Sequence, residues 1–354
     1  MPRVWDVPVH DSTRVPDARV AAESAAAVAG LDEGRTAAAA LVATELSTNL
    51  LKHAEGGQVL VEVVPPAAVS DGDDPAPVVQ IAAIDRGPGM ADVAAALRDG
   101  FSTTRSLGAG LGTCRRAADD FALHSAPGRG TVALARVGAA AKRPGTRHRP
   151  PADLWAGGIN IPFAGVEHSG DAWSWARAGD RVTLMLADGL GHGPGAARAS
   201  TAAVETLHRC AHLTPADLLR QLDAALRGTR GAAVALAQVD LRAQRLRFAG
   251  VGNVGARLRA GDTWRALLSK PGIVGAHLPT TLPEHQAPWG AGCLLILHSD
   301  GLPSRWTPPR GPGLPAADPA VVAAVTIRDA VSSARPVRDD TAVAVLTTTP
   351  PDHS

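Results

Sequence analysis

Two groups of polar residues in this sequence are spaced in ways that could support chemistry, and the first lies within residues 45–112. Glu45, Asn49 and His53 are each four residues apart, so an α-helix would place them on one face. A carboxylate and an amide oxygen are suitable ligands for Mg²⁺, which keeps several waters and takes few protein oxygens. This face therefore predicts a magnesium site, and the alternative is an ordinary helix surface.

Two glycine-containing segments follow that helix. Asp85 ends an apolar run and begins DRGPG, where a carboxylate could accept a hydrogen bond from an exocyclic amine and Gly87 and Gly89 let a flat base approach the backbone. The sequence GAGLG, at residues 108–112, directly precedes a predicted helix and offers backbone N–H groups to phosphate. Each segment alone is compatible with a simple turn. The order of all three segments is what indicates a nucleotide site.

The second group consists of aspartates at the predicted ends of strands. These aspartates are Asp171, Asp188, Asp300, Asp339 and Asp340. Carboxylates at strand ends can meet at one edge of a β-sandwich, where they suit hard cations such as Mg²⁺ or Mn²⁺. Two such ions can hold a phosphoryl group and activate water. The alternative for any single Asp-Gly pair is a hairpin turn, and His192 in GLGHGPG fits either a phosphate contact or a turn.

Hydrophobic patterning predicts the elements that position the first group. Their order favours an α+β domain with helices layered on one mixed sheet. Helices are expected at 14–29, 32–54 and 109–121, and strands at 4–9, 58–64, 78–84 and 131–137.

The second half of the chain is richer in predicted strands, which is typical of a β-sandwich flanked by helices. Strands are expected at 158–166, 171–177, 181–187, 232–240, 245–250, 254–259, 292–299 and 341–347, and helices at 194–212, 214–227 and 319–331. Residues 138–156 are rich in Pro, Arg and small residues, so we predict a linker there. The two domains are therefore expected at 1–137 and 157–348.

The first group resembles a known family. The segments TELSTNLLKHA, DRGPGM, RDGFSTTRSLGAGLGT and APGRGTVALAR are similar to the Bergerat-type (GHKL) ATP-binding fold of histidine kinases and anti-sigma serine kinases, and to RsbT-like switch kinases in particular. The resemblance implies an α/β sandwich that uses ATP with Mg²⁺ to phosphorylate Ser or Thr. It also implies these roles: Glu45 as base, Asn49 on Mg²⁺, Asp85 on adenine, Gly87 and Gly89 beside the base, Gly108, Gly110 and Gly112 in the phosphate lid, and Thr131 near adenine. Lys52 and His53 fit either phosphate contacts or the exposed end of the helix.

The second group also resembles a family. The segments GVEHSGDAWSW, LADGLGHGPGAARAS, GNVGARL, LHSDGL and RDDTAVAVL are similar to the metal-dependent PPM-type Ser/Thr phosphatases of the SpoIIE and RsbX branch. The resemblance implies two Mn²⁺ or Mg²⁺ ions. It also implies these roles: Asp188 bridging both metals, the Gly189 carbonyl on one of them, Asp171 on the second metal, Asp300 and Asp339 on the first, and Asp340 outside the metal ligands.

Composition excludes several classes of protein. The 35 Lys and Arg residues nearly balance the 34 Asp and Glu residues, so a nucleic-acid-binding surface over the whole chain is not expected. No run reaches the ~20 apolar residues of a membrane helix, and the N-terminus carries no apolar signal segment. Three widely spaced cysteines, Cys114, Cys210 and Cys293, fit a reducing compartment. We therefore expect a cytoplasmic protein.

These observations together predict a bifunctional signalling enzyme. An ATP-dependent Ser/Thr kinase and a metal-dependent phosphatase would act on a STAS-domain protein of the anti-anti-sigma or stressosome type in a partner-switching pathway. Two alternatives remain open. One is a partner-switching binding protein with a single activity or none, and the other is an anti-sigma kinase that binds a sigma factor or its regulator directly.

Overall fold

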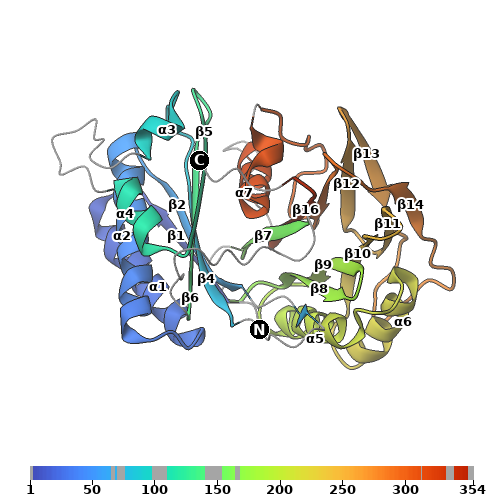
Figure 1. Cartoon of the computed structure of the whole chain (residues 1–354). Helices are drawn as coiled ribbons and strands as arrows, with labels where there is room; N and C mark the ends of the chain where they lie inside the picture. Colours follow the sequence, from blue (N-terminus) through green and yellow to red (C-terminus); the bar gives the residue numbers. More distant parts are fainter. Residues whose placement is uncertain are drawn as a thin grey trace. The chain divides into compact units, whose positions relative to one another are not determined.

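A computed structural model describes residues 3–64, 68–69, 76–97, 110–139, 154–163, 168–311, 313–331 and 339–349. The chain divides into two compact units, which are treated separately below (Figure 1). The first unit consists chiefly of Val4–Pro66 and Ala76–Arg149, and the second chiefly of Pro150–Pro351. Among the described residues, no helix is long and apolar enough to cross a membrane.

The first unit is a five-stranded sheet covered on one face by helices. Its strand order is β1-β2-β4-β6-β5, and α1, α2 and α4 lie on the same side of it (Figure 1). The elements are β1 (Val4–Val9), α1 (Val15–Val28), α2 (Glu33–Ala54), β2 (Gly57–Val64), β4 (Val78–Ile84), α3 (Val93–Ala96), α4 (Gly110–Ala117), β5 (Asp120–Ala126) and β6 (Gly130–Gly138), with a short 3₁₀ helix at Ser12–Arg14. This helix-on-sheet arrangement confirms the predicted α+β fold.

The pairing within this sheet differs from the expected mixed sheet. Every pair of neighbouring strands is antiparallel. The reason is the connections: α1 and α2 together return the chain so that β2 runs against β1, and β5 and β6 form a hairpin. One strand was also missed, because the helix predicted at 109–121 ends at Ala117 and β5 begins at Asp120.

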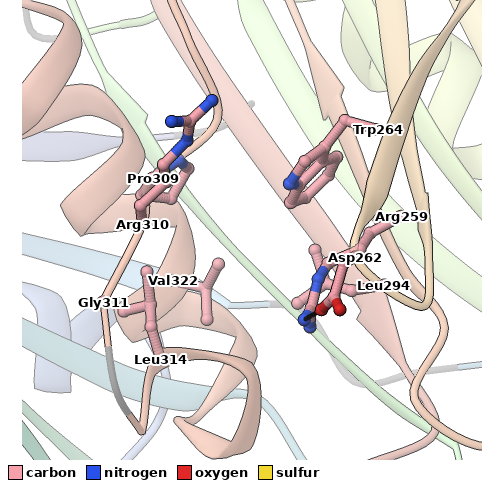
Figure 2. A pocket seen from close by; sticks show the side chains of 9 residues that line it. All are labelled: Arg259, Asp262, Trp264, Leu294, Pro309, Arg310, Gly311, Leu314 and Val322. Atoms are coloured by element: carbon pink, nitrogen blue, oxygen red, sulfur yellow. Dashed lines mark ion pairs between the residues drawn. The ribbon is translucent and has the colours of Figure 1, made fainter.

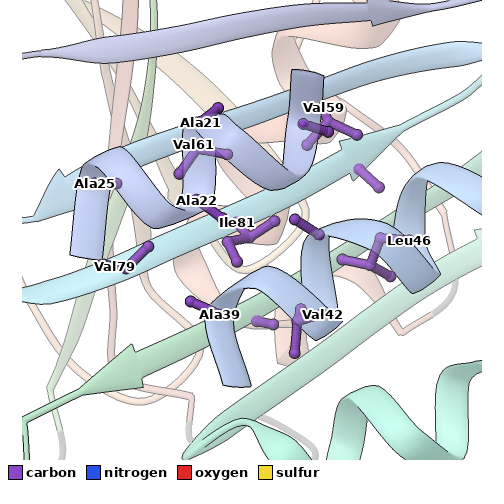
Figure 3. Close-up of a cluster of buried hydrophobic side chains, with 14 of the residues drawn as sticks. Ala21, Ala22, Ala25, Ala39, Val42, Leu46, Val59, Val61, Val79 and Ile81 are labelled. Atoms are coloured by element: carbon purple, nitrogen blue, oxygen red, sulfur yellow. The ribbon is translucent and has the colours of Figure 1, made fainter. Parts of the chain in front are cut away.

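Small side chains let the helices lie close to the sheet. Alanines of α1 and α2 pack on β-branched residues of β2 and β4 (Figure 3). The labelled members of this core are Ala21, Ala22, Ala25, Ala39, Val42, Leu46, Val59, Val61, Val79 and Ile81. Alanine has the highest helix propensity and loses no side-chain entropy on burial, so an Ala-rich face stabilises both the helix and its contact with the sheet.

The ends of α2 are determined by local interactions. The Asp32 side chain accepts a hydrogen bond from the Arg35 amide at 2.7 Å and caps the N-terminus. At the other end Glu55 adopts a left-handed conformation with φ 58°, followed by Gly56 with φ 118°. Glycine is the usual residue at the first left-handed position after a helix, and here Glu55 takes that position ahead of Gly56.

The second unit is a β-sandwich of two sheets with helices on its outer faces, as predicted. One sheet has the order β14-β11-β10-β9-β8-β3 and the other β13-β12-β15-β16-β7. Helices α5 and α6 pack against the first sheet and α7 against the second. The elements are β3 (Ala68–Val69), β7 (Trp155–Ile161), β8 (Asp171–Ala178), β9 (Arg181–Gly189), α5 (Pro194–Cys210), α6 (Pro215–Leu226), β10 (Ala232–Asp240), β11 (Arg245–Val251), β12 (Gly255–Ala260), β13 (Thr263–Leu268), β14 (His285–Pro288), β15 (Leu294–His298), α7 (Pro319–Ala330) and β16 (Thr341–Thr347), with a short 3₁₀ helix at Leu314–Ala316.

Three strands of this sandwich were not predicted, namely β3, β13 and β14. Strands β13 and β14 lie at sheet edges and expose most of their residues, so their sequences lack the apolar alternation of a half-buried strand. Most of the predicted linker, residues 140–153, lies outside the described part of the chain.

The core of the first unit yields a stability prediction. Leu46 is 1% exposed, whereas Leu41 on the same helix is 42% exposed. Leu46→Ala should lower the free energy of unfolding by about 2–5 kcal/mol, because it removes buried methyl groups and leaves a cavity. Leu41→Ala serves as the matched control, with a loss below about 1 kcal/mol. Urea unfolding followed by circular dichroism measures both, and equal losses in the two variants would contradict this description of α2.

Candidate active sites

In the first unit, Glu45 and Asn49 lie on one face of α2, toward the start of α4. A Cβ on Gly110 would lie 3.0 Å from Asn49 Oδ1, so Asn49 is in close contact with the first residue of α4. Burial, with a smaller contribution from the charge of Glu45, raises the pKa of the Cys114 thiol to about 12, which places Glu45 near the middle of α4. Within the described residues, the buried Nδ2 of Asn49 has no hydrogen-bond partner. An orphaned amide donor of this kind fits an acceptor such as a phosphate oxygen, whereas Oδ1 is the atom of this side chain that could bind a cation.

Asp85 follows β4 and has a fixed orientation. Its Oδ1 accepts hydrogen bonds from the Gly87 amide at 2.8 Å and the Thr131 amide at 3.0 Å. The Asp85 amide in turn donates to the Thr131 carbonyl at 2.9 Å. The side chain is nearly buried, with 9% of the residue exposed. The structure thus brings together Asp85, Gly87 and Thr131, three residues predicted to contact the base.

Glycines permit the close backbone contacts around Asp85. A Cβ on Gly89, which has φ 67°, would lie 2.1 Å from the Ala126 carbonyl oxygen, and a Cβ on Gly130 would lie 2.2 Å from the Asp85 carbonyl oxygen. Neither position can accept a larger residue without a shift of the backbone. Gly130 was not predicted as a site residue, although its place in APGRGT beside Thr131 was visible.

Ser125 is a further residue that the sequence analysis missed. Its hydroxyl accepts a hydrogen bond from the Met90 amide at 2.8 Å and lies 2.9 Å from the Thr131 hydroxyl. It therefore connects the DRGPGM segment to β6. No sequence signal pointed to Ser125, because the contact depends on the β5–β6 hairpin.

The remaining predicted residues of this site are less well placed. Gly112 is buried within α4, whereas Gly108 lies outside the described residues. Lys52 and His53 are exposed in the last turn of α2. This position agrees with the second of their two interpretations, residues at the exposed end of the helix.

In the second unit, Asp171 and Asp188 face each other across two strands. They occupy paired positions at the start of β8 and near the end of β9. Directly opposed residues in antiparallel strands point to the same face, with Cβ atoms about 4.5–5.5 Å apart. Ala187 belongs to the core beneath α5 and α6, so alternation turns Asp188 toward the opposite face of this sheet.

Asp300 and Asp339 come from the second sheet, where they flank β15 and β16. The Asn253 side-chain amide donates a short hydrogen bond to Asp300 Oδ2. Asp339 Oδ1 accepts a hydrogen bond from the Asp340 amide at 2.9 Å. Asn253 was not predicted as a site residue, although it lies in the GNVGARL segment that carried the resemblance.

Asp340 has a different environment from its neighbour. Its two carboxylate oxygens accept hydrogen bonds from the Phe163 amide at 2.7 Å and the Gly170 amide at 2.8 Å. Asp340 is 3% exposed, whereas Asp339 is exposed. Since both oxygens of Asp340 already hold backbone amides, this side chain supports the loop that precedes Asp171.

The loop before Asp171 contains a second supporting contact. Asn160 donates to the Asp171 carbonyl at 2.7 Å and accepts from the Ser169 hydroxyl at 2.7 Å. The Asp171 amide donates to the Ser169 hydroxyl at 3.1 Å. Asn160 and Ser169 therefore orient the backbone of Asp171 and leave its carboxylate uncommitted.

The aspartates strongly affect one another's ionisation. Burial, followed by the charge of Asp188, raises the pKa of Asp171 well above its ordinary value. Burial and the charges of Asp300 and Asp339 raise the pKa of Asp188 to about 8. The pKa of Asp300 is raised by burial and by the charge of Asp339. Carboxylates that raise one another's pKa in this way must share one region of the sandwich.

These residues fit divalent cations in their chemistry. Asp171 is fully buried, and within the described residues its carboxylate oxygens accept no hydrogen bond of ordinary geometry, although Ser299 lies close enough to lower its pKa slightly against the larger effect of burial. Oxygen donors of this type are what Mg²⁺ and Mn²⁺ take. In the described part of the chain, however, no three His, Cys, Asp or Glu side chains already form a group that could hold a metal ion. Asp300 and Asp339 nevertheless lie near enough to Asp188 for their charges to raise its pKa.

Gly189 packs tightly against the start of α5. A Cβ on it would lie 2.3 Å from the Ala196 carbonyl oxygen, and its amide donates to the Gly170 carbonyl at 3.1 Å. The glycine following Asp188 is therefore required by packing, whatever its carbonyl binds.

A pocket of about 240 Å³ lies elsewhere in the second unit (Figure 2). Its lining includes Arg259, Trp264, Leu294 and Arg310. In the paired strands β12 and β15, Arg259 and Leu294 lie opposite each other at the end away from Asp300. This pocket contains none of the predicted site residues and is separate from the aspartates.

Comparison with known proteins assigns a class to each unit. Residues 9–136 match the family model of the histidine kinase-like ATPase domain, and residues 178–349 match that of Stage II sporulation protein E (SpoIIE). The chain therefore joins a histidine kinase-like ATPase domain to a SpoIIE-type domain.

Individual relatives fall in the same classes. The serine/threonine-protein kinase RsbT of Bacillus subtilis (strain 168) is 39% identical over 88 residues, which are 25% of this chain and 61% of RsbT. The chain thus spans less than two thirds of this relative.

Two solved structures are also similar. One, from work on the bacterial stressosome, is 28% identical with a TM-score of 0.47 and covers 55% of this chain and 98% of its own. Another, RsbX in complex with magnesium, is 20% identical with a TM-score of 0.45 and covers 55% of this chain and 94% of its own.

The buried aspartates make the stability of the chain depend on pH. Because the pKa of Asp188 is raised from 3.8 to about 8, the folded state keeps a proton that the unfolded state releases. In the presence of a chelator, the free energy of unfolding should therefore fall as the pH rises from about 4 to about 8. Added Mn²⁺ binds the ionised carboxylates and should reverse the loss at pH 8.

Thermal unfolding of the full chain at pH 6 and pH 8, with EDTA or Mn²⁺, measures this effect. Asp188→Asn should reduce the dependence on pH, and Asp217→Asn, at an exposed position on α6, should not. A midpoint that is independent of pH in EDTA would refute the proposed electrostatics.

Proposed function

We propose that this chain is a bifunctional signalling enzyme, with an ATP-dependent Ser/Thr kinase in residues 1–137 and a metal-dependent Ser/Thr phosphatase in residues 157–348, joined by a linker. The two activities would add and remove phosphate on one regulatory protein. Such opposed activities would make the chain a two-way switch in a partner-switching pathway.

The buried and unpartnered carboxylate of Asp171, facing Asp188, is the observation that carries the phosphatase proposal. Burying a carboxylate beside a second acid is costly unless a cation compensates their charge. We assign Asp188 to both ions, the Gly189 carbonyl to one of them, Asp300 and Asp339 to the first ion and Asp171 to the second. Two Mg²⁺ or Mn²⁺ ions would supply charge neutralisation and an activated water for attack on phosphorus.

Three parts of the first unit support the kinase proposal. Asp85 is oriented by Gly87 and Thr131 to accept a hydrogen bond from adenine, and the orphaned amide of Asn49 lies at the start of α4. Asn49 would bind Mg²⁺, and Glu45, one turn earlier on α2, would accept the proton of the substrate hydroxyl. Gly110 and Gly112 would present backbone amides to the phosphates.

The substrate that we propose is a STAS-domain protein. The support is the 39% identity to RsbT over 88 residues, together with the SpoIIE-type domain in the same chain. ATP with Mg²⁺ would serve the first unit, and the chain would act in the cytoplasm. A binding protein without catalysis is less well supported, because it would not need the unpartnered polar atoms in both units.

Separate variants should divide the two activities. Asn49→Ala should abolish phosphate transfer from Mg·ATP to a STAS protein and leave phosphatase turnover intact. Asp188→Ala should abolish turnover of the phosphorylated STAS protein, by about 10³-fold or more, and leave the kinase intact. Radiolabelled phosphate transfer and release of inorganic phosphate measure the two reactions. An Asp188→Ala chain with near-normal turnover, or phosphatase activity that survives a chelator, would refute the two-metal proposal.

The adjacent aspartates should affect different properties. Asp339→Ala should lower phosphatase turnover with little change in the thermal midpoint, because its carboxylate is exposed and accepts only the Asp340 amide within the described residues. Asp340→Ala should lower the thermal midpoint, because the amides of Phe163 and Gly170 lose their acceptors. Turnover with Mn²⁺ and calorimetry on both variants provide the comparison. If Asp339→Ala lowered mainly the thermal midpoint and Asp340→Ala mainly the turnover, the roles given to these two residues would be wrong.

A further inference from the structure

Arg230, which has no role in the phosphatase mechanism proposed above, lies beside the DGLGHG segment. Arg230 occupies the turn between α6 and β10, and this turn continues into the pairing with β9. Ala233 pairs with Asp188, Ala232 pairs with Gly189, and the Gly231 carbonyl accepts a hydrogen bond from the Leu190 amide at 3.0 Å. Arg230 is therefore attached to the end of β9 that carries the candidate metal ligands.

The backbone of this turn is held in place. The Thr229 hydroxyl donates to the Leu226 carbonyl at 2.6 Å and accepts from the Gly231 amide at 3.0 Å. Gly228 and Gly231, with φ 87° and 82°, occupy conformations that other residues rarely adopt. The side chain of Arg230 thus leaves the backbone from a defined position.

The guanidinium of Arg230 lies against two glycines of the GLGHGPG loop. A Cβ on Gly195 would lie 2.8 Å from Nε and 2.9 Å from Cζ, and a Cβ on Gly191 would lie 3.1 Å from Nη1. Nη1 donates one long hydrogen bond, at 3.4 Å, to the His192 carbonyl. Glycine at both positions leaves space for the guanidinium beside the loop that follows Asp188 and Gly189.

Arg230 also differs from nearby arginines in its pairing. Arg220 and Arg227 form ion pairs with Asp217 and Asp223 on α6. Within the described residues, Arg230 is exposed and forms no ion pair. A guanidinium has five N–H donors in a planar fork that matches phosphate, so most of the donors of Arg230 remain free for a ligand.

The positive charge of Arg230 is suited to an anionic substrate. A phosphate monoester carries negative charge and must approach an edge rich in carboxylates. A cation at the rim offsets that repulsion, and the start of α5, capped by Gly193 without a side-chain hydrogen bond, favours an anion in the same place. We propose that Arg230 binds the phosphoryl group of the phosphatase substrate, an inference that rests on the phosphatase activity proposed above.

Kinetics with para-nitrophenyl phosphate and Mn²⁺ test this role in the full chain, because this substrate offers the phosphate without a protein surface. Arg230→Ala should raise KM, and the inhibition constant of inorganic phosphate, by about tenfold to a hundredfold through loss of a charge-assisted hydrogen bond. The change in kcat and in the Mn²⁺ activation constant should be smaller. Arg230→Lys should fall between wild type and Arg230→Ala.

Arg227→Ala is the matched control, since Arg227 is three residues away with its side chain 74% exposed and should leave all four constants unchanged. Unchanged phosphate inhibition in Arg230→Ala would overturn the inference. If only turnover of a phosphorylated protein changed, Arg230 would contact that protein and not the phosphate, which also overturns it. Failure of the wild-type chain to release para-nitrophenol would instead contradict the proposed phosphatase function, and with it the role of Arg230.

Discussion

The opposition of Asp171 and Asp188 across β8 and β9 is the interaction on which the second unit depends. The buried Asp171 and the half-buried Asp188 repel each other at paired positions, and the pKa of each is raised. The surrounding contacts maintain this arrangement. Asn160 and Ser169 orient the Asp171 backbone, and Asp340 holds the Gly170 amide. These contacts of the folded chain therefore hold together carboxylates that would otherwise move apart because they repel each other.

Both units place their polar side chains by the same means. In each, an aspartate lies at the end of a buried strand, Asp85 just after β4 and Asp188 in the last residues of β9, and a nearby glycine permits a close backbone approach. Gly130 approaches the Asp85 carbonyl in the first unit, and Gly189 approaches the Ala196 carbonyl in the second. The apolar strand provides rigidity and the glycine provides space, so the carboxylate has one defined position at the strand end.

The union of the two domain classes has a consequence for signalling. An ATPase domain of the histidine kinase-like class and a SpoIIE-type domain on one chain are produced in equal amounts. If both act as proposed, the balance of phosphorylation depends on the relative rates of the two sites and not on the abundance of two enzymes. Nucleotide supply and divalent cations would then both affect that balance, since each site needs a different combination of ligands.

The sequence by itself determined most of the elements and supplied the candidate residues of both proposed sites. Strands such as Val78–Ile84 and Thr341–Thr347 were predicted because a buried strand needs a continuous run of apolar residues, and Glu45 and Asn49 were placed on one helix face by spacing alone. Only the tertiary structure decided the antiparallel order of the first sheet and the edge strands β13 and β14. It also decided which residues Asn253, Ser125 and Arg230 contact. The physical reason is that these features depend on residues far apart in the chain. A hydrogen bond from Asn253 to Asp300, or a guanidinium beside Gly195, has no local pattern that reveals it.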